Sequence, residues 1–475
     1  MLQFPYLAAL SSEAKGGIGM ERKKKHSLTA IQSILLGFFV ATLVFSVLLY
    51  LPWATAPGEH TSYLDALFTA AASVSVTGLT VVNTATHWSL FGQIVILIGL
   101  QVGSLGIVSF TTGVLVVLGR RITLRDRILL ENDFNLDTLS GIETFLRGVV
   151  IGSLIGEALG TLLFLPVFVP EFGARGVWIA LFHAVSSFCN AGMDIIGGDS
   201  LAPYAGDLWL NLVTMLLIVA GGVGFVVWRD IHRVVRLVRR GEVRPRQFFH
   251  RLTLHSKISL SAYLVLLLGG WLLYGCFEWT NPATLGAMAP GERVLGALFQ
   301  SVTARTAGFY TVPQTGLRGS SLLLTIVLMF IGGSSVSAAG GVKTTTVALV
   351  ALSAWSVVKG EPEATAFRRT ISHRLVRRAS AVILLSILFL LGCTTLLSLL
   401  HGGGDLTDLF FEMTGVLSTT GLTRGICPEL NAAGRILVIC CMYFGRVGPF
   451  TLAIGLARRR GGLLSSYPEE SITIG

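Results

Sequence analysis

The sequence contains little charge for its length. Only 13% of its 475 residues are Asp, Glu, Lys or Arg, whereas a soluble domain has about 25%. Hydrophobic residues make up 52% of the chain, and the mean hydropathy is +0.72. Apolar runs of about 20 residues, long enough to cross a bilayer as helices, recur along the chain. The composition excludes an ordinary soluble protein and predicts an all-α polytopic membrane protein.

Cysteine is also scarce, with six residues in the whole chain. None of them has the CxxC or Cys/His spacing of a zinc site. This pattern argues against a disulfide scaffold or a structural metal centre. We interpret most of these cysteines as small apolar packing residues.

Acidic residues are outnumbered, 26 against 36 Lys and Arg, which gives a net charge of +10. Such an excess can indicate a nucleic-acid partner, but here the basic residues gather in short segments between apolar runs, as in 229–257 and 359–378. That distribution is the positive-inside pattern of membrane proteins. It predicts no nucleic-acid partner, a multi-pass protein in the lipid of the cell (inner) membrane, and N- and C-termini that are cytoplasmic.

A Leu-Phe pair followed about 11 residues later by a glycine occurs four times, at intervals of about 115 residues. The glycines are Gly78, Gly192, Gly308 and Gly421. Each unit reads as a long apolar helix, a short amphipathic helix, a glycine turn and a second long helix. The first helices are expected at 27–52, 142–170, 253–278 and 372–400. The second are expected at 88–118, 206–238, 319–358 and 430–457.

The short helices cannot span a bilayer about 30 Å thick at 1.5 Å per residue. Non-helical backbone at membrane depth is tolerated only where protein buries it or where it lines water. We therefore expect four re-entrant pore loops around one pore, entered from outside. Glycine permits positive φ, so carbonyl rings could replace an ion's hydration shell. The alternative is four glycine turns in an ordinary helical bundle.

The predicted organisation follows the repeats. A cytoplasmic N-terminal segment and a cytoplasmic C-terminal tail flank four pore repeats. The ranges are 1–26 for the N-terminal segment, 27–120, 140–240, 253–358 and 372–460 for the repeats, and 461–475 for the tail.

Several motifs resemble the Trk/Ktr/HKT superfamily of potassium transporters over about residues 27–460. They are "VTGL", "NAGM", "TAGF" and "TTGL" at the four glycines, "GGSSVSAAGGVKTTT" in the third unit and "GRVGP" in the fourth. The first unit starts without an additional pair of N-terminal helices, so the chain is most similar to the Ktr-type membrane subunit.

This resemblance implies an ion-selectivity filter with K⁺ as the transported ion and no covalent cofactor. Na⁺ as activator or co-ion, and symport with Na⁺ or H⁺, stay open. Cys189 and Met193 stand where the family pattern has Asn and Phe. The implied filter residues are Val76, Thr77, Gly78, Asn190, Ala191, Gly192, Thr306, Ala307, Gly308, Thr419, Thr420 and Gly421.

The glycine-rich run 332–341 sustains a helix poorly, because each glycine costs up to about 1 kcal/mol relative to alanine. We expect a break there, and the resemblance implies an intramembrane gate; the alternative is a local packing kink. Arg446, aligned with Ser104, Gly222 and Gly333, would place a positive charge in a cation pathway, or would pair with Glu157 or backbone carbonyls for structure only. The predicted gate residues are Gly332, Gly333, Ser334, Ser335, Ser337, Gly340, Gly341, Lys343 and Arg446.

Near the turns, we expect Arg305 and Glu412 to brace the filter. Asp194 would either attract cations at the mouth or serve as a simple cap.

The resemblance further implies a homodimer and a cytosolic RCK-type nucleotide-binding regulatory subunit. The basic segments 229–257, 359–378 and 458–475 are its candidate docking surfaces. Two alternatives are a sodium or ammonium transporter on the same scaffold and, more remotely, an intramembrane enzyme using Ser337 and Lys343.

Overall fold

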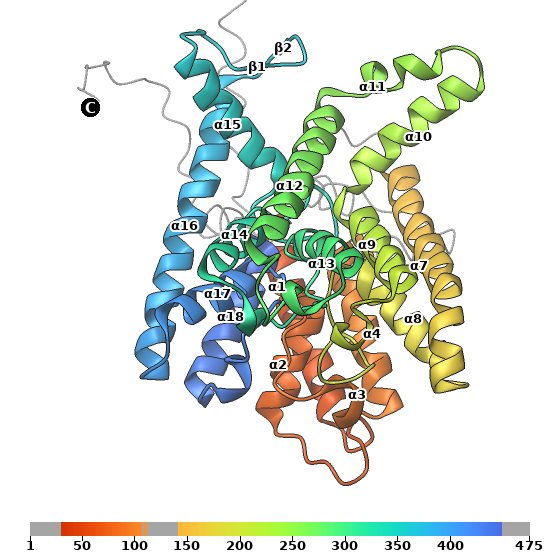
Figure 1. The fold of residues 1–475 in the computed structure, drawn as a ribbon, viewed down its shortest axis with the longest axis vertical. Helices are drawn as coiled ribbons and strands as arrows, with labels where there is room; N and C mark the ends of the chain where they lie inside the picture. Colours follow the sequence, from red (N-terminus) through yellow and green to blue (C-terminus); the bar gives the residue numbers. More distant parts are fainter. Residues whose placement is uncertain (1–29, 107–108, 111, 113–140, 449–475) are drawn as a thin grey trace, which may run out of the picture.

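The computed structural model describes residues 30–106, 109–110, 112 and 141–448. The predicted segments 1–26 and 461–475 lie outside this part, as do the ends of the first and fourth expected repeats. Nearly all of the described secondary structure is helical (Figure 1). Four of its helices are long and apolar enough to cross a membrane: α1 (Ala30–Tyr50), α7 (Ile142–Phe172), α12 (Leu254–Glu278) and α16 (His373–His401). They match the four expected first helices to within about two or three residues.

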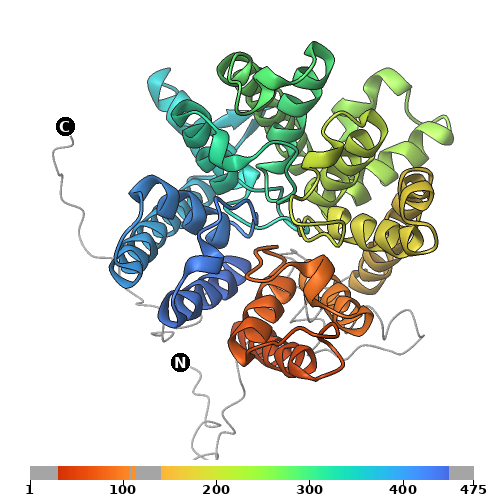
Figure 2. The same ribbon diagram turned by 60° about the horizontal axis from the view of Figure 1, so that its bottom comes forward.

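Each long helix is followed by a short helix and then by a second apolar helix. The short helices are α2 (Tyr63–Val74), α8 (Arg175–Phe188), α13 (Pro290–Thr303) and α17 (Leu406–Leu417). The helices that follow are α4 (Leu90–Leu105), α9 (Leu208–Gly222), α14 (Gly319–Phe330) and α18 (Ala432–Val447). We call the four groups repeats 1 to 4. In Figure 2 they surround a common centre in chain order.

The short helices form the centre of the packing. In repeats 1 to 3 the phenylalanine of the Leu-Phe pair has no exposed surface; in repeat 4 the phenylalanine of the pair, Phe410, is half-buried, and Phe411 beside it has no exposed surface. Every short helix packs against the long helix before it. Each also contacts the second helix of a neighbouring repeat: α4 packs on α8, α9 on α13, α14 on α17 and α18 on α2. The last contact joins repeat 4 to repeat 1, so the arrangement is closed. The buried phenylalanines are Phe68, Phe182, Phe299 and Phe411.

The second helix of repeat 2 is interrupted, which corrects the expectation of one continuous helix over 206–238. There α9 and α10 (Phe225–Arg239) meet at 95°. Gly224 between them has φ +98°, a conformation that a side chain strongly disfavours. Gly106 after α4 and Gly448 after α18 have nearly the same dihedral angles, with φ of +79° and +88°. In repeat 3 the predicted break is present: α14 and α15 (Thr344–Val358) are separated by loop 331–343.

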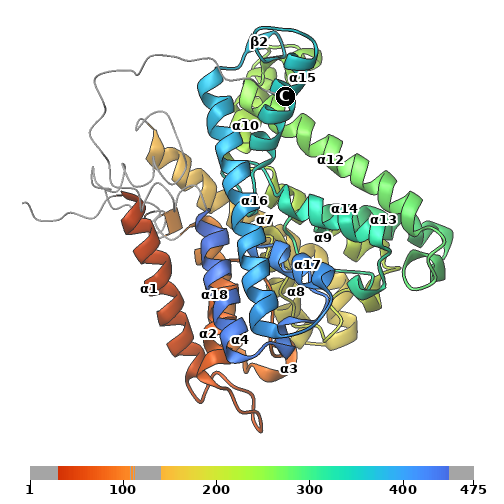
Figure 3. The ribbon, with the colours of Figure 1, turned by 90° about the vertical axis from the view of Figure 1, so that its left-hand side faces the viewer.

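Four further α-helices and two short strands lie at the two ends of the described part of the molecule. α3 (Thr84–His87) lies at one end, below α2 and α4 in Figure 1. At the other end, α10, α11 (Phe248–Arg251), α15 and the antiparallel pair β1 (Thr365–Ala366) and β2 (Arg369–Thr370) project from the bundle (Figure 3). The basic segments 229–257 and 359–378 therefore share one end.

Candidate functional site

The four glycine turns share one unusual backbone conformation. The residue two positions before each glycine has positive φ: 56° at Val76, 56° at Asn190, 64° at Thr306 and 52° at Thr419. The glycines follow with φ between 72° and 87°. Positive φ is strained for non-glycine residues, and most of all for β-branched ones. Such strain persists only where the surroundings over-determine it, and this is typical of functional sites.

The same turns contact each other in a closed ring. A Cβ atom added to Gly192 would lie 2.6 Å from the carbonyl oxygen of Ala307 in repeat 3. The other three glycines are equally confined by a carbonyl of the next repeat. Gly78 faces Ala191, Gly308 faces Thr420, and Gly421 faces Thr77, which returns the ring to repeat 1. Only glycine allows backbones to approach this closely.

In repeats 1 and 4, hydrogen bonds between side-chain hydroxyl groups within the turn stabilise its conformation. The hydroxyl groups of Ser75 and Thr77 lie 2.6 Å apart, and those of Ser418 and Thr420 make the same contact at 2.6 Å. Ser75 and Ser418 also donate to the carbonyl four residues earlier. These serines were absent from the sequence prediction, although the shared "S-x-T-G" pattern could have revealed them.

Repeats 2 and 3 have alanine in place of this threonine and use other supports. Cys189 lies 3.1 Å from the Ser104 hydroxyl group. Arg305 is 1% exposed and donates a hydrogen bond to the backbone carbonyl of Tyr263 at 2.8 Å. Its guanidinium carbon also lies 3.3 Å from the centre of the Tyr263 phenol ring. The carbonyl that accepts this hydrogen bond belongs to α12, not to the turn that Arg305 was expected to brace.

Glu412 supports the chain just after the fourth turn, as the sequence suggested. It is fully buried, and it accepts hydrogen bonds from the Thr423 hydroxyl group at 2.8 Å and from the Arg424 backbone amide at 3.1 Å.

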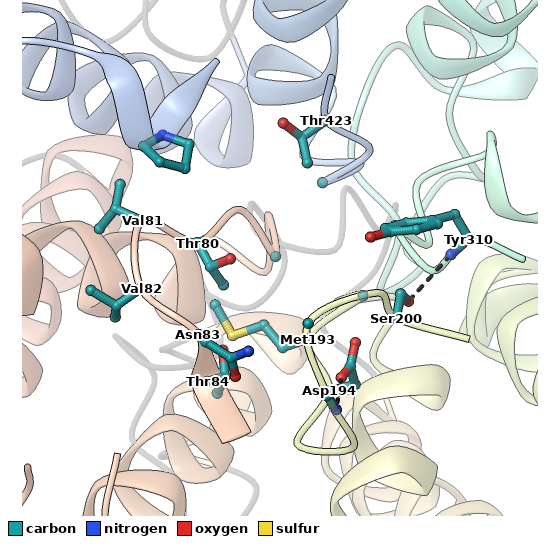
Figure 4. Close-up of a pocket in the computed structure, with 17 residues that line it drawn as sticks. Thr80, Val81, Val82, Asn83, Thr84, Met193, Asp194, Ser200, Tyr310 and Thr423 are labelled. Atoms are coloured by element: carbon teal, nitrogen blue, oxygen red, sulfur yellow. Dashed lines mark hydrogen bonds between the residues drawn. The ribbon is translucent and has the colours of Figure 1, made fainter. Parts of the chain in front are cut away.

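A cavity of about 260 Å³ opens on one side of the ring (Figure 4). All four ring glycines line it, together with residues of α3 and the loops after the turns, among them Thr80, Tyr310 and Thr423. Asp194 is the only carboxylate among the described residues that line it, and its Oδ1 accepts a hydrogen bond from the Ile196 amide at 3.3 Å. Burial raises the pKa of Asp194 to about 6, although hydrogen bonds from the Gly197 and Ile196 amides oppose the shift.

Loop 331–343 lies on the other side of the ring. A Cβ atom on Gly340 would lie 2.6 Å from the Ser418 carbonyl oxygen, and one on Gly332 would lie 3.1 Å from the Thr306 side chain. Within the loop, the Gly332 amide donates to the Val342 carbonyl at 3.0 Å, and the Lys343 ammonium donates to the Ala339 carbonyl at 2.6 Å. Two of the predicted gate residues, Gly332 and Gly340, therefore lie directly against two of the four turns.

Arg446 of α18 connects loop 331–343 to the end of α4. It donates to the Ala338 carbonyl at 2.6 Å and to the carbonyls of Gly103 and Ser104 at 2.7 and 2.9 Å. Backbone carbonyls, one of the expected alternatives, are thus among its partners. The last carbonyls of a helix have no partner within the helix, so Arg446 satisfies the end of α4 while also binding the loop.

Sequence reasoning missed where the loop docks. The Ser334 and Ala338 amides donate to the carbonyls of Gly222 and Gly221, and the Phe225 amide donates to the Val336 carbonyl. The alignment of Gly222 with Ser104, Gly333 and Arg446 carries no indication of a partner in repeat 3.

Comparisons with known proteins identify the family of this chain. The family described as "TrkH: Cation transport protein" matches residues 9–459. "Potassium/sodium uptake protein NtpJ" of Enterococcus hirae is 37% identical over 96% of this chain and 99% of its own length. "Ktr system potassium uptake protein B" of Bacillus subtilis is 34% identical over 94% of this chain and 97% of its own.

Among solved structures, the potassium transporter TrkH from Vibrio parahaemolyticus has a similar fold. The TM-score is 0.69 at 21% identity, with 92% of this chain and 87% of that chain covered. These relatives are transport proteins, which sets aside the alternative of an intramembrane enzyme. The extent of the family match and the near full-length relatives lead to one assignment: the chain belongs to the TrkH family of cation transport proteins.

Proposed function

We propose that this protein takes up potassium across the cell membrane through a single pathway along the axis of the four repeats. Ions enter the cavity beside Asp194, lose their hydration shell to backbone carbonyls of the four turns, and leave past loop 331–343. The observation that carries the proposal is the closed ring, in which each glycine turn meets a carbonyl of the next repeat.

The four turns are then re-entrant pore loops. Their short helices have 12 or 14 residues, too few to span a bilayer, and their ends meet at the centre of the molecule. Non-helical backbone is tolerated at this depth because it lines a water-filled route. Carbonyl rings of this kind select among cations.

Glycine at all four positions and the names of two relatives favour potassium. A sodium transporter is the second candidate, because the name of the Enterococcus hirae relative includes both ions. Sodium as an activator or co-ion is compatible with either assignment. Inward movement of one charge through 100 mV releases about 2.3 kcal/mol, so the membrane potential suffices to drive uptake.

Loop 331–343 and Arg446 form the gate in this proposal, and the described conformation is the shut one. The loop adjoins the inner side of the ring, and two cationic side chains, Lys343 and Arg446, bind its carbonyls. Fixed positive charge in a narrow pathway opposes a permeating cation. Opening requires the loop and Arg446 to separate.

The end that carries α10, α11, α15 and β1–β2 faces the cytoplasm in this proposal, because it holds the basic segments 229–257 and 359–378. These segments are the candidate docking surfaces for a cytosolic RCK-type nucleotide-binding subunit, and the chain would work as a homodimer. The word "system" in the name of the Bacillus subtilis relative supports the idea of separate components.

The test is potassium uptake in cells that lack their own uptake systems. The wild-type chain should restore growth at low potassium, whereas Gly308→Ser should abolish it or admit sodium. Gly392→Ser is the matched control, because a Cβ atom at Gly392 on α16 meets nothing within 4 Å. Uptake of sodium but not potassium by the wild type would assign the second candidate. Equal uptake by Gly308→Ser and the control would contradict the filter.

A further inference from the structure

The break between α9 and α10 is the surface on which loop 331–343 docks. The Ser334 amide donates to the Gly222 carbonyl at 3.0 Å, and the Ala338 amide donates to the Gly221 carbonyl at 3.3 Å. The Phe225 amide donates to the Val336 carbonyl at 2.8 Å. The end of one helix leaves carbonyls without partners and the start of the next leaves amides without partners. The loop satisfies groups of both kinds.

Close approach makes this docking specific to glycine. A Cβ atom on Gly224 would lie 2.7 Å from the Ser335 carbonyl oxygen, and one on Gly333 would lie 2.9 Å from the Gly222 carbonyl oxygen. A side chain at either position would push the loop off the break. A third element, α12, adds a hydrogen bond from the Ser259 hydroxyl group to that of Ser334 at 3.0 Å.

The loop is strained at Val336, the residue whose carbonyl accepts the hydrogen bond from Phe225 of α10. Val336 has φ +57°, and a β-branched residue in this conformation is a genuine outlier. Such a conformation persists only while its surroundings impose it. The Phe225–Val336 hydrogen bond is part of what imposes it, so the loop would relax if that bond were lost.

α10 links this bond to the exposed cytoplasmic end. Phe225 is its first residue and is buried, whereas Arg229, Arg233 and Arg236 further along are exposed. Asp230 anchors the helix midway: its Oδ2 accepts hydrogen bonds from the Thr253 amide at 2.8 Å and hydroxyl group at 3.0 Å, at the start of α12. A tilt of α10 about this anchor would displace Phe225.

We propose that the backbone of Phe225 and Val336 forms a latch through which α10 holds the gate loop shut in its strained conformation. This inference rests on the proposed gating role of the loop and assigns the control of that gate to repeat 2. Phe225 and Val336 are positioning residues. Neither needs to touch the ion, and movement of the exposed end of α10 opens the latch.

The experiment measures rubidium uptake, normalised to membrane-inserted full-length protein, for Phe225→Pro and Phe225→Ala. Both variants lose the phenyl ring, but only proline also removes the amide donor, and proline fits the first position of a helix. Loss of one hydrogen bond shifts the open-to-shut ratio by about fivefold. We expect uptake about fivefold higher for Phe225→Pro than for Phe225→Ala. Equal uptake would overturn the latch.

A second pair of variants tests the strain and gives the opposite sign. Asparagine tolerates positive φ, so Val336→Asn should stabilise the docked loop and lower uptake by about fivefold. Val336→Thr keeps the β-branched shape and should remain close to the wild type. If Phe225→Pro does not reach the membrane, the comparison of Val336→Asn with Val336→Thr decides whether the latch exists. Uptake by Val336→Asn at or above that of Val336→Thr would reject the latch.

Arg446→Gln separates failure of the latch from failure of the gate. If Arg446→Gln raises uptake while the Phe225 pair and the Val336 pair show no difference, the loop is a gate but α10 does not hold it. If uptake is unchanged in Arg446→Gln and in all four other variants, the gating role itself is wrong and the latch falls with it.

Discussion

Arg446 and Ala338 belong to different repeats, yet the arginine side chain lies 2.6 Å from the alanine carbonyl oxygen. The same guanidinium also binds the end of α4, so one side chain connects repeats 1, 3 and 4 beneath the ring. Charge-assisted hydrogen bonds of this kind are stronger than neutral ones. The contact lets Arg446 position the loop and, in the proposed pathway, supply a fixed positive charge.

Removing that charge should open the pathway. We expect Arg446→Gln to raise potassium uptake about tenfold, because a hydrogen bond to a charged group contributes about 1.5–3 kcal/mol. Arg446→Lys should have a smaller effect, since lysine keeps the charge but lacks the planar fork that reaches several carbonyls. Uptake rates at matched expression check this. Equal rates for Gln, Lys and the wild type would exclude Arg446 from the gate.

Because the four glycines occupy equivalent places in the ring, we expect substitution of any of them to affect ion selectivity in the same way. We expect Gly78→Ser and Gly421→Ser each to lower the ratio of potassium to sodium uptake about tenfold, or ~1.4 kcal/mol. In both, the new Cβ atom would overlap a carbonyl of the adjacent repeat. Competitive uptake with both ions measures the ratio, and Gly392→Ser serves as the control. A strong effect in one repeat and none in the other would show that the ring does not act as a unit.

Asp194 predicts a dependence on external pH. With a pKa of about 6, its ionised fraction falls from about 90% at pH 7 to about 10% at pH 5. Uptake at limiting potassium should fall severalfold over this range. Burial raises this pKa, so protonation of Asp194 at low pH favours the folded state, and its titration does not itself destabilise the protein. Tyr310 also lines the cavity, and its raised pKa keeps it neutral throughout.

The control for this dependence is Asp199→Asn, which changes an exposed carboxylate on the same loop that is absent from the cavity lining. Asp194→Asn should give low uptake that no longer changes between pH 7 and 5, whereas Asp199→Asn should keep the wild-type profile. A wild-type profile in Asp194→Asn would assign the titration to another group.

The junction between the first and last repeats should contribute to stability. Arg435 on α18 lies 2.7 Å from Asp65 on α2, and both side chains are at most 20% exposed. We expect Asp65→Asn to destabilise the protein by about 1 kcal/mol and to lower the Tm by a few degrees. Adding Arg435→Gln should lower the Tm further only through the loss of its hydrogen bonds to the Leu430 and Pro428 carbonyls, because the ion pair is already lost.

Thermal unfolding of the purified protein in detergent checks this pair. Glu242→Gln provides the comparison, since its partner Arg240 lies 3.9 Å away and both side chains are more than half exposed. A Tm for Asp65→Asn equal to that of Glu242→Gln would show that the junction does not depend on this ion pair.

Much of this fold follows from local sequence. The four long helices and the four glycine turns could be placed because hydrophobic runs and a repeated glycine report directly on burial and backbone freedom. The break at 331–343 was also foreseeable, since four glycines and three serines lie within 332–341. The function class followed from the same repeats.

The breaks at Gly106 and Gly224 could not be predicted in the same way. Glycine within an apolar helix is usually tolerated, and a helix ends there only if something else satisfies its free backbone groups. Here those partners are Arg446 for α4 and loop 331–343 for α9. Both come from other repeats, more than a hundred residues away, so a single repeat carries no signal of the break.

The closed ring also sets an order of assembly. A chain is synthesised from its N-terminus, and its parts fold as they emerge. The turn at Gly78 meets Ala191 once repeat 2 is present, but its other face, at Thr77, waits for Gly421 near the end of the chain. The first three repeats can therefore insert into the membrane without forming a pathway. A nascent chain held at this stage lacks both the fourth turn of the ring and the arginine that binds the loop, so both contacts form only when the last repeat is present.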